Sequence, residues 1–250
     1  AEISFDFNRV KGAIKPMHGV GQPPLLGIDT QYFKYLSEAH IPYSRLHDTE
    51  YPFGSGEFGD ISCIFKYFDA DVDDPASYNF ALTDLYLQAI RECGTQIIYR
   101  LGVSIEHNPI KIHIWPPKDN LKWAKICEHI IMHYNEGWAD GFHMDIKYWE
   151  IWCEPNHCKD KDWKLWGGTA EDFAELYATA STYLKGRFPE LKFGGPAFSN
   201  PDDDFVQAMF TALTKDGRHP PMDFYSWHGY LFNIEKAVER SHMAEKVLAQ

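Results

Sequence analysis

The stretch IKYWEIWCEPN, from Ile146 to Asn156, is rich in aromatic and β-branched residues and closes on a carboxylate, a proline and an asparagine. Successive side chains of a β-strand point to opposite faces, so Glu150, Trp152 and Glu154 are expected to share one face. Pro155 has no N–H group and is expected to end the strand. The pattern therefore predicts a strand that presents Glu154 at its end, on a rigid element.

Working outward from this stretch, apolar extended segments alternate with amphipathic helical ones. Strands are predicted at residues 12–21, 41–48, 95–103, 146–152, 191–197 and 222–230. Helices are predicted at residues 29–39, 79–94, 120–136, 169–188, 202–213 and 235–250. A further short strand is predicted at residues 61–68, inside a long excursion rich in Gly, Asp and Pro.

Six strand-then-helix units in series predict an α/β fold with a parallel sheet covered by helices. An open doubly wound sheet would need a G-x-G-x-x-G loop after an early strand, and GVGQPP at residues 19–24 lacks that spacing. A (β/α)8 TIM barrel fits better, because polar and aromatic residues gather at the carboxyl ends of the strands. About six of the eight units are present. We therefore expect residues 1–250 to belong to one barrel domain that continues to strand seven beyond Gln250.

The carboxyl of Glu154 is flanked by bulky rings, which would partly remove it from water and suit it to donate a proton. The residues alone are as compatible with a surface carboxylate at a strand end. Glu150, one layer deeper, is expected to pair with Arg45 or Arg100 on neighbouring strands. An unpaired buried charge there would be too costly.

The composition argues against several classes of partner. The formal net charge of -12 disfavours nucleic acid, because phosphates need a positive surface. No run of 18 apolar residues is present, so no membrane span is predicted. Five cysteines at irregular spacing do not fit a secreted disulfide framework, so free thiols and a cytoplasmic location are predicted. The sequence opens on Ala1 rather than Met, which leaves a removed signal peptide as an alternative.

A zinc site is the competing interpretation of two clusters. Cys153, His157 and Cys158 lie close together in the sequence, and His129 and His133 lie one helical turn apart. Their spacings match no established ligand framework, and the helical pair lacks the glutamate of H-E-x-x-H. We therefore predict no metal and no cofactor, and retain a zinc-dependent hydrolase as an alternative.

The stretch WEIWCEPN resembles the W-N-E-P motif of the retaining glycosidases that share a (β/α)8 barrel, the clan A glycoside hydrolases. Within that clan the sequence is most similar to family thirty-nine, the β-xylosidase/α-L-iduronidase family. Four further segments agree in order and spacing: YSRLHD (43–48), PPKDNLKWAKICEHIIMHY (116–134), KFGGPAFS (192–199) and DFYSWHGY (223–230). The likeness covers most of residues 10–250.

This resemblance implies a retaining glycosidase that acts on a small oligosaccharide or glycoside, most similar to a β-xyloside. Glu154 would be the general acid/base, and the nucleophile would follow strand seven, beyond residue 250. The residues expected to line the sugar subsite are His47, Cys153, Asn156, His228 and Tyr230, with Trp152 as a candidate stacking platform.

One departure from the family concerns Cys153, which stands where the family usually has Asn. An Asn amide can hydrogen-bond the sugar 2-hydroxyl, whereas a thiol is a weak donor and acceptor. Loss of that bond would cost about 1–3 kcal/mol. The alternative function is therefore a catalytically impaired, carbohydrate-binding barrel. The sequence predicts neither the sugar and linkage nor the oligomeric state.

Overall fold

The protein is described by a computed structural model that covers residues 4, 6, 8, 9, 12, 16, 18–27, 29–49, 58–106, 109–157, 165–231 and 233–249. Its centre is a parallel sheet of five strands in the order β1-β2-β3-β4-β5. The strands are β1 (Tyr43–Arg45), β2 (Gln96–Leu101), β3 (Tyr148–Ile151), β4 (Lys192–Phe198) and β5 (Phe224–Trp227). Strand order follows chain order, as it does in a barrel built one unit at a time.

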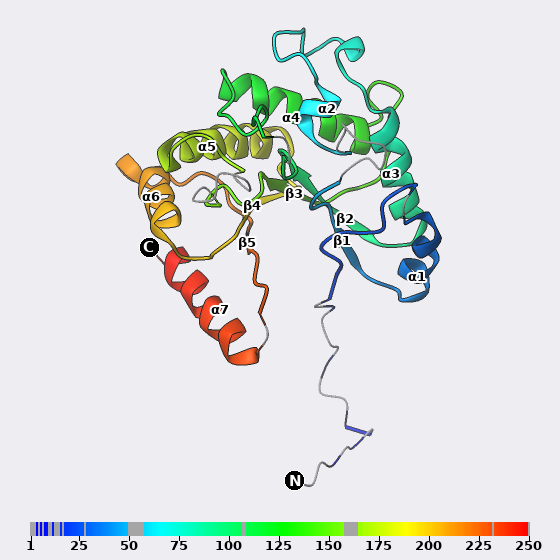
Figure 1. The fold of residues 1–250 in the computed structure, drawn as a ribbon, viewed down its shortest axis with the longest axis vertical. Helices are drawn as coiled ribbons and strands as arrows, with labels where there is room; N and C mark the ends of the chain where they lie inside the picture. Colours follow the sequence, from blue (N-terminus) through cyan, green and yellow to red (C-terminus); the bar gives the residue numbers. More distant parts are fainter. Residues whose placement is uncertain are drawn as a thin grey trace.

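Helices cover the outer side of this sheet (Figure 1). The α-helices are α1 (Phe33–Glu38), α2 (Ile61–Ile64), α3 (Ala81–Glu92), α4 (Asn120–Asn135), α5 (Ala170–Arg187), α6 (Asp204–Leu213) and α7 (Ile234–Leu248). Short 3-10 turns occupy η1 (Thr30–Tyr32), η2 (Pro75–Ser77) and η3 (Lys215–Gly217). The helix start at Thr169 is a capping box: Thr169 and Asp172 each accept the other's backbone N–H.

Neighbouring strands sort their side chains onto two faces. Trp149 of β3 lies opposite Tyr99 of β2 and Phe193 of β4, and all three rings are buried. The Tyr99 and Trp149 rings stack with centroids 4.9 Å apart, and Tyr99 packs towards Tyr134 of α4. The apolar core therefore lies between the sheet and its helices, and the adjacent position in β3, Glu150, faces the other way.

The sheet is curled rather than flat. The β1 and β5 edges of a flat five-stranded sheet would lie roughly 19 Å apart. Yet the rings of His47, just after β1, and His228, just after β5, stack with centroids 4.8 Å apart. The curl thus brings the carboxyl ends of both edge strands together, and the five strands form part of a barrel (Figure 1).

The inner face of the curled sheet is the one that carries Glu150, and glycines in β4 make room for that side chain. Gly194 is the register partner of Glu150, and the Glu150 side chain passes over β4 to reach Ser226 of β5. A Cβ atom added at Gly195 would lie 2.8 Å from Cγ of Glu150, and the φ of Gly195 is +111°. A larger residue at Gly195 would therefore push Glu150 away from its position.

The predicted alternation of strands and helices is confirmed from β1 to α7, with one wrong element. Residues 61–64 form the helix α2, not part of a strand. The short apolar run is ambiguous in sequence, and buried contacts of Ile61 and Ile64 decide its conformation. The first predicted strand is represented by Val20, which forms a parallel bridge with Ser44, while most of residues 10–17 lie outside the described residues. Within the described part of the chain, no helix has the length and apolar character needed to cross a membrane.

We expect Gly195→Ala to lower the free energy of unfolding by about 1–3 kcal/mol. The new methyl group would clash with Glu150, and alanine would be strained at the positive φ of this position. Gly186→Ala is the matched control: this glycine lies in α5, with nothing within 4 Å of the added Cβ. The control should stabilise the protein by about 0.5–1 kcal/mol. Urea unfolding followed by circular dichroism measures both, and equal effects of the two substitutions would contradict this account of Gly195.

Candidate active site

The strand geometry of β3 ends before Glu154. Trp152 and Glu154 have φ values of 72° and 44°, in the left-handed region that non-glycine residues seldom occupy. The N–H of Trp152 donates to Leu101 O, and that of Glu154 donates to Pro196 O and Ala197 O at 3.1 and 3.2 Å. These bonds to the neighbouring strands hold the chain in its strained conformation. Strain of this kind is typical of functional sites.

Because the alternation stops, Trp152 and Glu154 meet different neighbours. The Trp152 indole is buried, donates to Leu165 O at 2.9 Å and packs edge-on against Trp166. Glu154 instead contacts His228. The structure therefore places Trp152, a predicted sugar platform, in the outer layer and not beside Glu154.

The carboxyl of Glu154 is held by an imidazole. Its Oε1 shares a short hydrogen bond with Nδ1 of His228, and Glu154 is 8% exposed. The backbone N–H of His228 donates to Phe198 O at 2.7 Å, which fixes the residue at the end of β5. The bond sets the orientation of the carboxyl, and the remaining exposure leaves it open to a ligand.

His47 stacks on His228 and is fixed from two sides. Its Nδ1 lies 2.9 Å from Oδ2 of Asp48, and its backbone N–H donates to Gln22. Burial would raise the pKa of Asp48, but the bond and charge of His47 outweigh it, so the pKa is lowered. His47 Nε2 is buried and has no hydrogen-bond partner among the described residues.

Beneath the two imidazoles lies a buried ion pair. Arg45 Nε donates to Glu150 Oε2 at 2.7 Å, and Ser226 donates to Glu150 Oε1 at 2.6 Å. This confirms that Glu150 pairs with one of the two predicted arginines. The partner is Arg45, whereas Arg100 pairs with Asp60. Burial would lower the pKa of Arg45, but the adjacent Glu150 carboxylate raises it overall, so the guanidinium stays charged.

Cys153 lies against this ion pair. Its side chain is buried, and Nη2 of Arg45 points at Sγ from 3.5 Å. Burial raises the pKa of Cys153 to about 12, despite the opposing effect of the Arg45 charge. The group is therefore a neutral thiol at physiological pH, in the position where the resemblance leads us to expect an amide.

Asn156 and Tyr230, the other two residues predicted to line the sugar subsite, lie outside the group formed by Glu154, His228, His47 and Cys153. The Asn156 amide donates to Asn200 O and to Asp203 Oδ2, and its oxygen accepts the backbone N–H of Ser199 at 2.9 Å. Asn156 thus ties the end of β3 to the loop before α6. Tyr230 is 82% exposed, and its ring centroid lies 6.4 Å from that of His228, at the open edge of the cluster.

Among the described residues, neither of the clusters considered for zinc in the sequence forms a group of three ligands. His133 bonds Asp84 and Trp138 O, and His129 bonds Lys125 O, so both are used within the helical layer. Cys158 lies outside the described residues. Sequence reasoning missed a different group, in which His47, Cys153 and His228 each place a ligand atom within 4.8 Å of the others. The three residues are far apart in the sequence, so no local spacing pattern could indicate that they meet.

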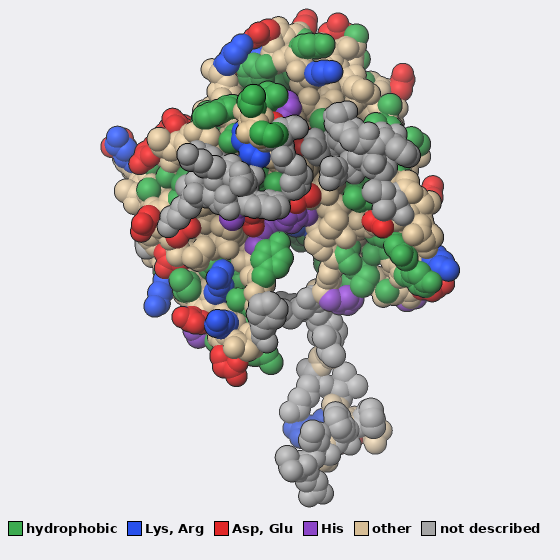
Figure 2. Space-filling model, in the orientation of Figure 1, with side chains coloured by type: hydrophobic (Ala, Val, Ile, Leu, Met, Phe, Trp, Pro, Cys, Tyr) green, Lys and Arg blue, Asp and Glu red, His purple; other side chains and the backbone are tan. Residues whose placement is uncertain are grey.

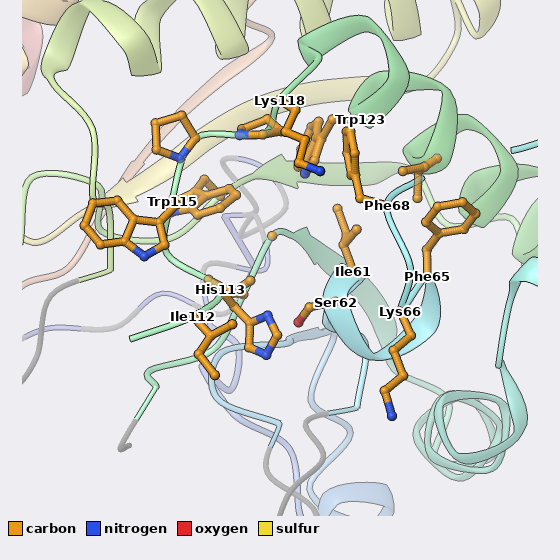
Figure 3. A pocket seen from close by; sticks show the side chains of 16 residues that line it. Ile61, Ser62, Phe65, Lys66, Phe68, Ile112, His113, Trp115, Lys118 and Trp123 are labelled. Carbon is orange, nitrogen blue, oxygen red and sulfur yellow. The ribbon is translucent and has the colours of Figure 1, made fainter. Parts of the chain in front are cut away.

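A separate pocket of about 280 Å³ opens on the outer side of the β2 and β3 ends (Figure 3). Figure 3 shows Trp115 on one side of it and Phe65 and Phe68 on the other. Trp152 lines this pocket, whereas Cys153 and Glu154 do not. The pocket and the Glu154 cluster are therefore distinct sites.

Residues 34–250 match the model of the family "Glycosyl hydrolases family 39". The chain belongs to family 39 of the glycosyl hydrolases. No curated protein matches it. The five-stranded curled sheet with its outer helices is the barrel architecture of clan A glycosidases, as the resemblance implied.

Solved structures of glycosidases share the fold of this chain. A glucosidase from Croceicoccus marinus matches with a TM-score of 0.72 and 27% identity, over 93% of this chain and 49% of that chain. Two α-L-arabinofuranosidases share the fold. The family 51 enzyme from Bifidobacterium longum has a TM-score of 0.51 and 15% identity over 93% and 45% of the two chains. The enzyme from Thermotoga maritima has a TM-score of 0.52 and 16% identity, over 92% of this chain and 47% of that chain. The family 39 chain thus spans about half the length of these structures.

In this family 39 chain we expect Arg45→Met to lower the free energy of unfolding by about 3–5 kcal/mol, because it leaves the Glu150 charge buried and unpaired. The double variant Arg45→Met/Glu150→Leu should lose much less than the sum of the two single variants. Denaturant unfolding measures the cycle. Lys118→Met, which breaks an exposed pair with Asp69, is the control and should behave like the parent protein. Additive single effects at Arg45 and Glu150 would contradict the coupling.

Proposed function

We propose that this chain carries the acid/base half of a retaining glycoside hydrolase, in a catalytic barrel domain that continues beyond residue 250. The observation that carries the proposal is the Glu154–His228 pair, which sets a nearly buried, oriented carboxyl at the carboxyl ends of the strands. That edge is where barrel enzymes place their chemistry. Membership of family 39 supports carbohydrate as the substrate class.

In the first step, protonated Glu154 gives its proton to the glycosidic oxygen while a second carboxylate attacks the anomeric carbon. The glycosidic bond breaks, the alcohol leaves, and a glycosyl ester forms on the nucleophile. In the second step Glu154, now a carboxylate, takes a proton from water as the water attacks the same carbon. The ester breaks and both carboxyl groups return to their starting states, so no cofactor takes part.

The inner face offers a partner for the second carboxylate. Nη1 of Arg45 is buried and has no hydrogen-bond partner among the described residues, while the other two nitrogens of the guanidinium bond Glu150 and approach Cys153. A charged donor in this position can bind and orient a carboxylate. This supports a nucleophile that enters the cluster next to Arg45, from strand seven of the barrel.

For the substrate we propose a small β-glycoside of the β-xyloside type, bound between His47, Cys153, His228 and Tyr230. The two stacked imidazoles supply hydrogen-bonding groups, and the exposed Tyr230 ring can cover an apolar sugar face. The glucosidase and arabinofuranosidases that share the fold support a monosaccharide-sized subsite of this kind.

We expect Glu154→Gln in the complete protein to lower kcat for aryl glycosides with poor leaving groups by about a hundred- to ten-thousand-fold. Substrates with strongly acidic phenols should be affected least in the first step, because they need little protonation. Azide should restore turnover by replacing water in the second step. Steady-state kinetics across a leaving-group series tests this expectation.

Glu92→Gln, at the exposed end of α3, is the control and should keep the parent kinetics. Parent-like turnover of poor leaving groups by Glu154→Gln would refute the assigned role. An unchanged thermal unfolding midpoint shows that loss of activity does not arise from misfolding.

A second candidate, a sugar-binding barrel with impaired chemistry, is favoured by one observation: the neutral, buried thiol of Cys153 at the position of the family's Asn. If the missing amide bond limits catalysis, Cys153→Asn should raise kcat/KM by roughly five- to a hundred-fold, corresponding to about 1–3 kcal/mol. Aryl glycoside kinetics on the complete protein measures the change. Calorimetric sugar binding without turnover in both the parent and Cys153→Asn would contradict the role given to Cys153 in impairing the chemistry.

A further inference from the structure

Two histidines and a cysteine converge on one point of the inner face. His47 follows β1, Cys153 follows β3 and His228 follows β5, and one ligand atom of each lies within 4.8 Å of the others. Figure 2 shows histidine side chains gathered near the middle of this face, beside acidic side chains. Imidazole nitrogen and thiolate sulfur are the ligand types that zinc prefers in proteins.

Each imidazole has a carboxylate at Nδ1. Asp48 engages Nδ1 of His47, and Glu154 engages Nδ1 of His228. When each ring is neutral and donates its Nδ1–H to that carboxylate, Nε2 carries the free lone pair. A carboxylate behind the ligating histidine is the usual support of a protein zinc site. His47 Nε2 is also buried without a partner in the described part of the chain, and a buried polar atom of that kind points to a missing partner.

We propose that His47, Cys153 and His228 bind a zinc ion, or another divalent ion of similar softness, in the sugar subsite. Ligand atoms around a tetrahedral zinc lie roughly 3.3–3.6 Å apart, given bond lengths of about 2.0–2.3 Å. From 4.8 Å or less, each pair of ligand atoms must approach by roughly 1 Å. One of the two stacked imidazoles must also turn, so that both rings direct a nitrogen at the same ion. As the sulfur–zinc bond forms, Cys153 releases its thiol proton to water.

The surrounding charges accommodate a cation. Glu150, Glu154 and Asp48 contribute negative charge near the three ligands, against Arg45 and Arg100. The negative charge of the Cys153 thiolate would neutralise one of the two positive charges of the bound ion. An enzyme of this family with Asn in place of Cys153 would lack the sulfur ligand.

Zinc bound here would occupy the space next to Glu154 and compete with the sugar. The competition, unlike the binding, rests on the proposed function. We therefore infer that zinc acts as a reversible inhibitor whose effect is relieved by a chelator. Binding and inhibition are measured separately, so that the failure of one is distinguishable from the failure of the other.

The test titrates cobalt chloride and zinc chloride into the complete, metal-free protein under reducing conditions. One equivalent of cobalt should bind and produce the visible absorption bands of a tetrahedral complex, together with a thiolate-to-cobalt charge-transfer band. Zinc should displace the bound cobalt and remove these bands. Cys153→Ser should abolish the charge-transfer band, and His47→Gln should weaken zinc binding by at least about ten-fold in calorimetry.

Cys93→Ser is the matched control, since this cysteine lies on α3's end and bonds only Phe33 O and Ala89 O in the described structure. It should keep both the band and the zinc affinity. The absence of a charge-transfer band at saturating cobalt, or a band that persists in Cys153→Ser, would overturn the site.

The inhibition is tested with aryl glycosides at increasing zinc concentration. Competitive inhibition that is lost in Cys153→Asn and reversed by a chelator is expected. Zinc that binds in the cobalt-competition assay but leaves kcat/KM unchanged would overturn the overlap with the sugar subsite, while a protein that binds zinc but turns over no glycoside would count against the proposed function alone.

Discussion

The buried ion pair between Arg45 and Glu150 is the interaction on which the inner face of this barrel depends. Glu150 stands in the central strand of the described sheet, and its two oxygens are bonded to β1 through Arg45 and to β5 through Ser226. A side chain in the middle of a flat sheet could not easily contact both edges. The pair is therefore both a consequence of the curl and a constraint on it, and the bare backbone at Gly194 and Gly195 gives Glu150 the room it needs.

The groups that carry the chemistry stand on this support. Ser226 also accepts the backbone N–H of Ala197, whose carbonyl oxygen accepts the N–H of Glu154. Arg45 meets Cys153 as well as Glu150. The Glu154 carboxyl, the Cys153 thiol and the ion pair thus form one connected network, which explains how a strained residue at a strand end can hold a fixed direction. The same network that orients Glu154 for its proposed proton transfer also brings His47, Cys153 and His228 together.

Much of this could be predicted from the sequence. Alternating patterns predicted every strand from β1 to β5 and its helix. The cost of an unpaired buried charge predicted that Glu150 pairs with Arg45 or Arg100, and the structure shows that the partner is Arg45. The direction of Trp152 could not be predicted, because alternation fails where the left-handed conformation begins, and bonds from β2 and β4 set that conformation. The helix α2 was missed because its four residues, three of them apolar, suit either element. The meeting of His47 with His228 depends on the curl, which no local pattern contains.

The central claim is that the curled sheet aims Glu154 at a second carboxylate across a sugar-sized gap, beside the free donor of Arg45. A crystal structure of the complete protein tests this most directly, through the distance between the carboxyl groups of Glu154 and the strand-seven nucleophile. The account predicts about 5–5.5 Å, with Nη1 of Arg45 bonded to the nucleophile. A separation of about 6.5–9.5 Å, or a Glu154 carboxyl turned away from the second carboxylate, would contradict it.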